Sequence, residues 1–265
     1  MSLSKFQPPN PTSTMPSPTN DSTPLSIDRV LDFLTHGKIE AKQLLPWGSN
    51  ATLLVTIKHS DLESLAIYKP RDGENPLWDF PEGTLCNREV AAFVVSQALD
   101  WLIVPPTILR AGPQGIGMLQ FYIDCDPNEH YFTLRDDDRF TDQFQKIVLF
   151  DLLINNADRK SGHCLRAASD HVWAIDHGVC FSIEPKLRTV MWDYAGQPIP
   201  IGLRDDLKSL HARLDQPGDP AIQALNELLD RREITALKRR ATQLIASDCF
   251  PRPQPGYRQI PWPPV

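Results

Sequence analysis

The first pattern of apolar and polar positions along the chain predicts a helix that is followed by strands. Residues 26–34 have apolar side chains at helical spacing, with Ser26 as a suitable N-cap and Gly37 as a stop signal. Residues 51–58 and 65–69 are rich in β-branched and other apolar residues, which predicts two strands that pair through a polar turn.

Helical patterns dominate further along the chain. Residues 89–101 predict an apolar helix that opens at Glu89, 107–110 and 117–124 predict two more strands, and 140–155 predicts a second apolar helix. Three further helices, each with one polar face, are expected near 204–214, 219–231 and 233–247. Strands precede helices, an order that predicts an α+β fold with a β-rich N-lobe and a mainly helical C-lobe.

The two ends of the chain are rich in proline. Residues 1–24 contain mainly Pro, Ser, Thr and Asn, and they predict a disordered tail because they cannot bury enough apolar surface to offset their ordering entropy. Residues 251–265 predict an extended strap that Tyr257, Ile260 and Trp262 would pin to the surface.

Composition and charge narrow the class of protein. A chain of 265 residues suits two lobes, which we place at 25–124 and 125–250. A net charge of −6 argues against a nucleic-acid partner, because such proteins usually have a basic domain. No apolar run is long enough to span a bilayer, and the start of the chain lacks the apolar core of a secretory signal. The five scattered cysteines fit reduced thiols, so we expect a cytoplasmic protein, and a monomer, without integral membrane association.

Candidate chemistry is concentrated in residues 155–178, where two carboxylates in polar loops bracket a predicted hairpin. Asp158 follows the second apolar helix and is poised to accept or orient a hydroxyl proton. Arg159 and Lys160 beside it favour its ionised form and could meet an anionic substrate. Asp176 ends an apolar strand, where a charge is costly unless a cation such as Mg²⁺ compensates it.

The predicted strands before this stretch offer residues for a phosphate. Lys69 at a strand end can bind phosphate as a point charge, or it can be an ordinary solvated lysine. Glu89 could pair with Lys69, although the helix dipole alone also favours an acidic residue in a first turn. The loop at 48–50 has small residues that let backbone N–H groups approach phosphate oxygens, or it is a simple turn.

At these residues the chain resembles a known group of kinases. Asp158-Arg159, followed by a strand that ends in Ile175-Asp176-His177-Gly178, resembles the catalytic and metal-binding loops of the phosphatidylinositol 3-/4-kinases and, more distantly, those of the HipA-like kinases. The resemblance extends over roughly residues 37 to 200 to a bacterial family related to those kinases. Its further motifs are Gly48-Ser49-Asn50, Tyr68-Lys69-Pro70, Trp78-Asp79-Phe80-Pro81, Val104-Pro105-Pro106-Thr107 and Glu184-Pro185-Lys186-Leu187-Arg188.

This resemblance implies an ATP-dependent phosphotransferase with a kinase-like fold. It implies that Lys69 contacts the α-phosphate, that Asp158 is the catalytic aspartate with Arg159 and Lys160 beside it, and that Asp176 is the main ligand of Mg²⁺ or Mn²⁺. An inter-lobe linker near 119–123 would receive adenine. The residues that would contact the nucleotide are Lys69, Ser49, Asn50, Glu89, Gln120, Phe121 and Tyr122.

One residue departs from the kinase pattern. The kinases usually place Asn five residues after the catalytic aspartate as a second metal ligand, and here that position is His163. Neutral imidazole binds softer divalent metals better than it binds Mg²⁺. The site could therefore prefer Mn²⁺, or hold one ion through Asp176, or belong to a pseudokinase that binds nucleotide without catalysis. Transfer of AMP on the same fold is a further alternative.

Two questions stay open at the level of sequence. A structural zinc site from His163, Cys164, His177 and Cys180 has the right ligand types, although an adjacent His and Cys rarely face one ion. The acceptor substrate could be a protein, a lipid or a small molecule. The lipid substrate of the kinases is not implied, because the chain lacks the Lys/Arg cluster that binds anionic headgroups. A cationic rim for the acceptor is expected from Arg159, Lys160, Lys186 and Arg188.

Overall fold

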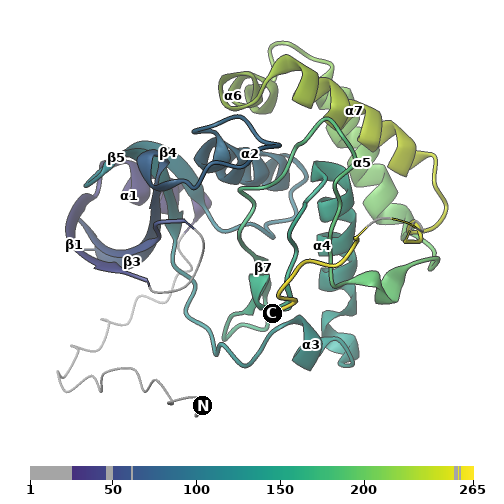
Figure 1. Cartoon of the computed structure of the whole chain (residues 1–265), viewed down its shortest axis with the longest axis horizontal. Helices are drawn as coiled ribbons and strands as arrows, with labels where there is room; N and C mark the ends of the chain where they lie inside the picture. The colour runs from purple at the N-terminus through teal and green to yellow at the C-terminus, as the bar shows by residue number, and fades with distance from the viewer. Residues whose placement is uncertain (1–25, 46–49, 61, 254–255, 257) are drawn as a thin grey trace.

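The structure is a computed structural model that describes residues 26–45, 50–60, 62–253, 256 and 258–265 (Figure 1). The tail expected at 1–24, the loop residues Gly48 and Ser49, and Tyr257 of the expected strap lie outside the described residues. Among the described residues, no helix combines the length and the apolar character needed to cross a membrane.

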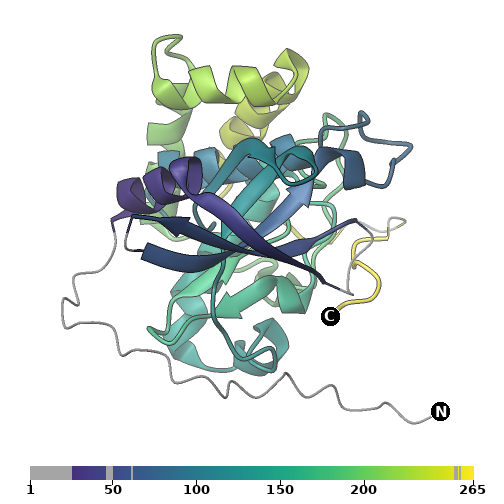
Figure 2. The ribbon, with the colours of Figure 1, turned by 90° about the vertical axis from the view of Figure 1, so that its left-hand side faces the viewer.

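An antiparallel sheet of five strands forms one side of the molecule, with the strand order β1-β2-β3-β5-β4 (Figures 1 and 2). Its strands are β1 (Lys38–Leu44), β2 (Leu53–His59), β3 (Leu62–Pro70), β4 (Thr107–Gly112) and β5 (Gly115–Phe121). Alternate side chains of the central strands, such as Val55, Ile57 and Tyr68, are buried in one cluster with Phe33 and Leu34 of helix α1 (Ile27–His36). Burial of every second residue is what the period of a strand dictates, and it covers one face of the sheet.

Two features of the sheet differ from the sequence-based prediction. Strand β1 was not predicted, because its Lys-Ile-Glu-Ala-Lys-Gln-Leu sequence carries charges of the kind that mark an edge strand and little apolar signal. Strand β5 includes Leu119, Gln120 and Phe121, which pair with β3. The predicted linker at 119–123 is therefore wrong in its first three residues, and the chain leaves the sheet at Tyr122.

Helix α2 (Leu85–Ala98) starts four residues before the predicted Glu89, so Glu89 lies in its second turn and does not open it. The backbone N–H groups of Leu85 and Cys86 donate to the carboxylate of Glu74, at 3.0 and 2.7 Å. This cap comes from a residue eleven positions upstream of the helix start. Local capping signals therefore could not mark where the helix begins.

The rest of the chain is mainly helical, as predicted. The helices are α3 (Tyr131–Leu134), α4 (Thr141–Ile154), α5 (Ile201–Leu214), α6 (Pro220–Leu228) and α7 (Arg231–Ile245), and the hairpin strands are β6 (Cys164–Arg166) and β7 (Val172–Ala174). Short α3 was not predicted. The largest buried cluster joins α4, α5 and α7 to α2, which lies between the sheet and the helical lobe (Figure 1). The chain has the two-lobed, kinase-like α+β fold that its order of elements predicts.

The C-terminal segment is held by its backbone and not by the side chains that were expected to pin it. Ile260 and Trp262 are 52% and 74% exposed, whereas Pro261 between them is buried. The carbonyl oxygens of Gln259 and Pro264 accept hydrogen bonds from the main body of the protein. The prediction of pinning by Ile260 and Trp262 is therefore wrong, because both side chains face solvent.

The close approach of β5 to β3, the strand that carries Lys69, can be tested by substitution. A Cβ atom on Gly117 would lie 2.7 Å from the Cα of Pro70, and main-chain atoms cannot rotate away from it. We expect Gly117→Ala to lower the free energy of unfolding by about 1–3 kcal/mol through overpacking. Gly202→Ala is the matched control, because a Cβ there has no neighbour within 4 Å. Urea unfolding of both variants checks this, and equal stability would contradict the close approach.

Candidate active site

Three segments that are far apart in the sequence bring their charges together between the lobes. Lys69 lies near the end of β3, where strand alternation turns its side chain away from α1 and toward α2. Its Nζ atom lies 2.6 Å from Oε1 of Glu89 and 2.8 Å from Oδ1 of Asp176. The structure thus brings together three of the residues that the sequence singled out.

The charges of these three groups depend on one another. Burial favours the neutral amine, but the carboxylates of Asp176 and Glu89 raise the pKa of Lys69 above its ordinary value. The charge of Lys69 in turn lowers the pKa of Asp176 far below the usual range. Burial raises the pKa of Glu89, whose side chain is 2% exposed. At neutral pH Lys69 is therefore a cation and Asp176 a carboxylate.

Glu89 also fixes the loop that follows β7. Its Oε2 atom accepts a hydrogen bond of 2.8 Å from the backbone N–H of His177. Asp176 next to it has a φ of 62°, in the left-handed region that a non-glycine residue adopts at a cost. Helix α2 therefore holds both the lysine and the Asp176 loop in place.

His163 contacts Asp176 from the loop of residues 155–163, which is the candidate catalytic loop. Its Nε2 atom lies 3.3 Å from Oδ2 of Asp176. Burial lowers the pKa of His163 to about 4, so its ring is neutral at pH 7. The backbone N–H of Lys160 donates to Nδ1 at 3.5 Å, which leaves Nε2 to carry the proton and donate to Asp176. The two residues predicted as metal ligands are thus in contact.

Asp158 lies in the same loop with its carboxylate partly open to solvent. Its backbone N–H donates to Oδ1 of Asn156 at 3.0 Å, and Nζ of Lys160 lies 3.4 Å from its Oδ2. Burial raises the pKa of Asp158, and the negative charge of Asp176 raises it further, while Lys160 lowers it. A carboxylate of raised pKa is a stronger proton acceptor than an ordinary aspartate.

Arg159 has a different place from the one predicted. Its fully buried guanidinium donates to both oxygens of Asp151 at 2.8 and 3.0 Å. It also donates to the carbonyl oxygens of His163 and Ile175 and to Nε2 of His177. The prediction that Arg159 meets an anionic substrate is wrong, because a guanidinium with no exposed surface cannot touch one. Its role in this structure is to join the catalytic loop to the Asp176 loop.

Asp151 and two asparagines were missed by sequence reasoning as parts of the site. Asn156 donates from Nδ2 to Asp151 and accepts from the N–H of Asp158, so it links the buried ion pair to Asp158. Asn155 ends α4 in the left-handed conformation and donates from Nδ2 to the carbonyl oxygens of Ser182 and Glu184. A single carboxylate within the apolar sequence of α4 was the signal for Asp151.

The residues predicted to contact the nucleotide are only partly gathered. The buried side chain of Gln120 donates to Oγ1 of Thr107 at 2.9 Å, within the sheet. Oδ1 of Asn50 accepts from the N–H of Asn75 at 2.7 Å, which ties the loop before β2 to the loop before α2. Contact of these residues, of Phe121 and Tyr122, and of Ser49 with a nucleotide stays a prediction.

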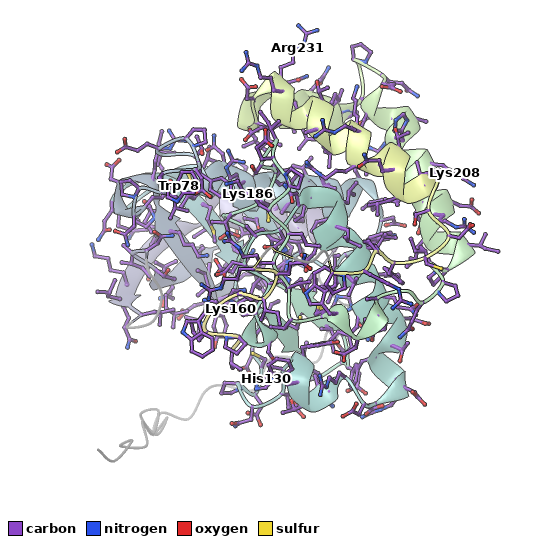
Figure 3. The ribbon with its side chains drawn as sticks, turned by 45° about the vertical axis from the view of Figure 1, so that its right-hand side comes forward. Trp78, His130, Lys160, Lys186, Lys208 and Arg231 are labelled. Atoms are coloured by element: carbon purple, nitrogen blue, oxygen red, sulfur yellow. The ribbon has the colours of Figure 1, made fainter. Side chains whose placement is uncertain are left out.

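Lys186 of the expected cationic rim is engaged with the loop before α2. Its Nζ atom lies 2.5 Å from Oδ2 of Asp79, and it also lies over the rings of Trp78 and Phe80, at 5.2 and 5.6 Å from their centroids. Trp78 is 95% exposed, and Figure 3 shows it beside Lys186 at the surface. This contact joins the two lobes on the side of the molecule that also carries Lys160.

The four residues of the alternative zinc site do not share a centre. Cys164 and Cys180 are buried free thiols, and burial raises the pKa of Cys164 to about 12. His177 is held by Arg159 through Nε2. Within the part of the chain that the structure describes, no three or more His, Cys, Asp or Glu side chains are grouped as metal ligands.

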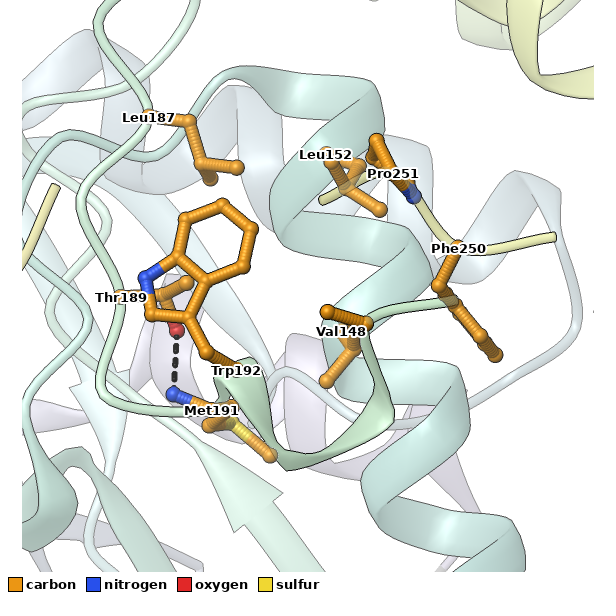
Figure 4. Close-up of a pocket in the computed structure, with 9 residues that line it drawn as sticks. Val148, Leu152, Leu187, Thr189, Met191, Trp192, Phe250 and Pro251 are labelled. Carbon is orange, nitrogen blue, oxygen red and sulfur yellow. Dashed lines mark hydrogen bonds between the residues drawn. The ribbon is translucent and has the colours of Figure 1, made fainter. Parts of the chain in front are cut away.

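Two pockets lie away from the two aspartates. One is a narrow apolar pocket between α4 and Trp192 with a volume of about 10 Å³, room for about one water molecule (Figure 4). The other, of about 270 Å³, is formed by residues 71–85 before α2. Neither pocket is lined by Asp158 or Asp176, so neither extends the candidate site.

Comparisons with known proteins agree with this kinase-like geometry. The family model described as phosphatidylinositol 3- and 4-kinase matches residues 106–212, which include both aspartate loops. Protein Rv2133c of Mycobacterium tuberculosis (strain ATCC 25618 / H37Rv) is 40% identical over 266 residues, covering 87% of this chain and 93% of the relative. The chain therefore belongs to the phosphatidylinositol 3-/4-kinase-related family of kinase-like proteins that includes Rv2133c.

A solved structure gives a weaker likeness. The crystal structure of the Helicobacter pylori proinflammatory kinase CtkA is 15% identical in sequence and has a TM-score of 0.42. The match covers 80% of this chain and 98% of that one. The distant similarity to the HipA-like kinases stays a prediction.

The buried position of Arg159 can be tested through stability. Arg159→Met leaves Asp151 as a buried carboxylate without its cation, so we expect the free energy of unfolding to fall by about 3–5 kcal/mol. Lys208→Ala is the control, because its ion pair with Asp205 is exposed and its loss should change stability little (Figure 3). Urea unfolding measures both. Parental stability together with a raised KM for an acceptor would instead support contact of Arg159 with substrate.

Proposed function

We propose that the protein is an ATP-dependent phosphotransferase. The observation that carries the proposal is the meeting of Lys69 with Glu89 and Asp176, at 2.6 and 2.8 Å, beside the loop of Asp158. Phosphoryl transfer needs a cation on the phosphates, carboxylates for a metal and a residue that orients the nucleophile. These residues supply one group for each task. We further propose that it acts in the cytoplasm and as a monomer.

Lys69 and Asp176 would receive the nucleotide. Asp176 keeps 42% of its side chain exposed, and its ionised carboxylate lies next to the neutral imidazole of His163. A carboxylate and an imidazole are donors that fit a divalent cation, with Mn²⁺ better suited to this pair than Mg²⁺. The bound cation would neutralise phosphate charge. Lys69 would then hold phosphate oxygens through its ammonium group.

Asp158 would act on the acceptor. Its carboxylate would accept a hydrogen bond from the acceptor hydroxyl and hold the oxygen in line with the terminal phosphorus of ATP. A new phosphorus–oxygen bond forms as the bond to ADP breaks, and the hydroxyl proton passes to Asp158. The raised pKa of Asp158 supports this role, while Lys160 keeps the carboxylate ionised before the reaction.

One observation favours nucleotide binding without catalysis as a second candidate function. Lys69 and His163 each contact a different carboxylate oxygen of Asp176. A metal ion that binds Asp176 by either oxygen must share that oxygen with one of these donors or displace it. The pseudokinase alternative therefore rests on a feature of the site, whereas no feature of the described residues favours transfer of AMP over transfer of phosphate.

Substitutions of the two aspartates are expected to have different effects. Asp176→Ala should abolish metal-dependent ATP binding, because the main metal ligand is lost. Asp158→Ala should keep ATP binding and lower kcat by about 10²–10⁴-fold, the usual range for a catalytic base. Calorimetric titration with ATP and Mn²⁺, together with turnover of γ-labelled ATP in a cell lysate, measures both. If both variants bind and react like the parent protein, the assignment fails, and if the parent binds ATP without turnover, the pseudokinase function is supported.

His163 gives a test of metal choice. An amide oxygen suits Mg²⁺ better than an imidazole nitrogen does, so His163→Asn should raise the ratio of Mg²⁺-dependent to Mn²⁺-dependent ATP affinity several-fold. His171→Asn is the control, because His171 bonds to the carbonyl of Leu102 and not to the site. An unchanged metal profile in His163→Asn would remove His163 from the metal site.

A further inference from the structure

The C-terminal segment, residues 258–265, lies against the catalytic loop and has no regular secondary structure. The N–H of Ser161 donates to the carbonyl of Pro264 at 2.8 Å. The N–H of Thr189 and Nε1 of Trp192 both donate to the carbonyl of Gln259, at 3.0 and 3.1 Å. We refer to Ser161, Thr189 and Trp192 as the docking surface. All three are donors that bind main-chain carbonyls, so they recognise the backbone of a peptide.

The middle of the docking surface is built like a short strand with two edges. On one edge, residues 188–190 bond to the catalytic loop: Arg188 N–H donates to Asn156, Arg159 N–H to Arg188, and Val190 N–H to Arg159. The N–H of Thr189 between them turns the other way, to the C-terminal segment. Main-chain hydrogen bonding of a peptide to an exposed backbone edge is a common mode of peptide recognition.

The side chains of the C-terminal segment differ in their burial. Pro261 is buried, whereas its neighbours Ile260 and Trp262 are exposed. Proline has a preset backbone angle and no N–H, so it favours an extended chain whose carbonyls serve as acceptors. The occupant therefore needs a buried proline with a main-chain carbonyl acceptor on each side of it in the sequence.

The docking surface lies beside the candidate catalytic residue. Ser161 follows Asp158 by three positions, so their Cα atoms are within about 11 Å of each other along the chain. The C-terminal end lies beside β7 in Figure 1, and the segment passes next to Lys160 in Figure 3. A peptide on this surface therefore lies next to the loop that carries Asp158, whose carboxylate is partly open to solvent.

We propose that the docking surface binds a proline-containing peptide of a protein acceptor, and that the chain's own C-terminal segment occupies it until such a peptide displaces it. The acceptor role rests on the proposed phosphotransferase function, whereas the occupancy does not. The attached segment competes at an effective concentration on the order of millimolar. A free peptide of the same sequence therefore binds weakly to the parent protein.

Two matched variants of the full chain test this. Pro261→Gln places a polar side chain at the buried position and should release the segment. Ile260→Gln makes the same kind of change at an exposed neighbour and should leave it docked. The probe is a fluorescent synthetic peptide with the sequence of residues 258–265, RQIPWPPV. We expect it to bind Pro261→Gln at least about tenfold more tightly than it binds the parent and Ile260→Gln.

A second measurement places the peptide on the docking surface without any need for activity. The backbone N–H groups of Ser161 and Thr189 should exchange with deuterium faster in Pro261→Gln than in the parent, and added peptide should restore their protection. Equal peptide affinity for all three proteins, or unchanged exchange at these two amides, overturns the proposal. So does a concentration-dependent dimer of the parent that Pro261→Gln abolishes, because the segment would then act between copies.

The acceptor role is tested by transfer of labelled phosphate to dephosphorylated casein as a protein probe. Pro261→Gln should lower the KM for casein, and the free peptide should compete with casein and not with ATP. Competition with ATP overturns the acceptor assignment. Absence of transfer in every protein, with peptide binding and amide protection as expected, overturns the proposed function and leaves the docking surface supported.

Discussion

The buried ion pair between Arg159 and Asp151 is the interaction on which the rest of the site depends. Its guanidinium bonds to carbonyls of both aspartate loops, so one side chain sets the distance between them. A buried charge costs several kcal/mol unless it is paired and its remaining donors are satisfied. Asp151 pairs with the charge, and the carbonyls of His163 and Ile175 accept from the remaining donors. The two loops cannot separate without leaving donors of this buried guanidinium without acceptors.

The balance of charges in the candidate site indicates how a nucleotide would enter. Lys69 and Lys160 face the carboxylates of Glu89, Asp176 and Asp158, and His163 is neutral. Two cations against three carboxylates leave an excess of negative charge, which opposes a phosphate chain that arrives alone. A divalent cation that arrives with the nucleotide reverses that balance. The same excess of negative charge attracts the ammonium group of Lys69 to the carboxylates of both Glu89 and Asp176.

The sequence predicted the features that local patterns and the resemblance to kinases indicate. It placed Lys69, Asp158, Asp176 and most helices, because strand and helix periods and loop motifs are local. It missed what depends on residues far apart in the chain. Glu74 caps α2 from eleven residues upstream, so the helix start shifted and Glu89 moved into the second turn. Arg159 looked like a surface cation beside Lys160, and only its partner Asp151 on α4 shows that it is buried.

The same geometry explains how access to the site could change while the site stays intact. Residues 188–190 bond to the catalytic loop on one edge and to the C-terminal segment on the other. Loss of the segment removes hydrogen bonds from the outer edge, where water can replace them. The inner edge and the ion pair of Arg159 keep Asp158 and Asp176 in place. Displacement of the segment would therefore expose the N–H groups of Ser161 and Thr189 without a change in the spacing of the two aspartates.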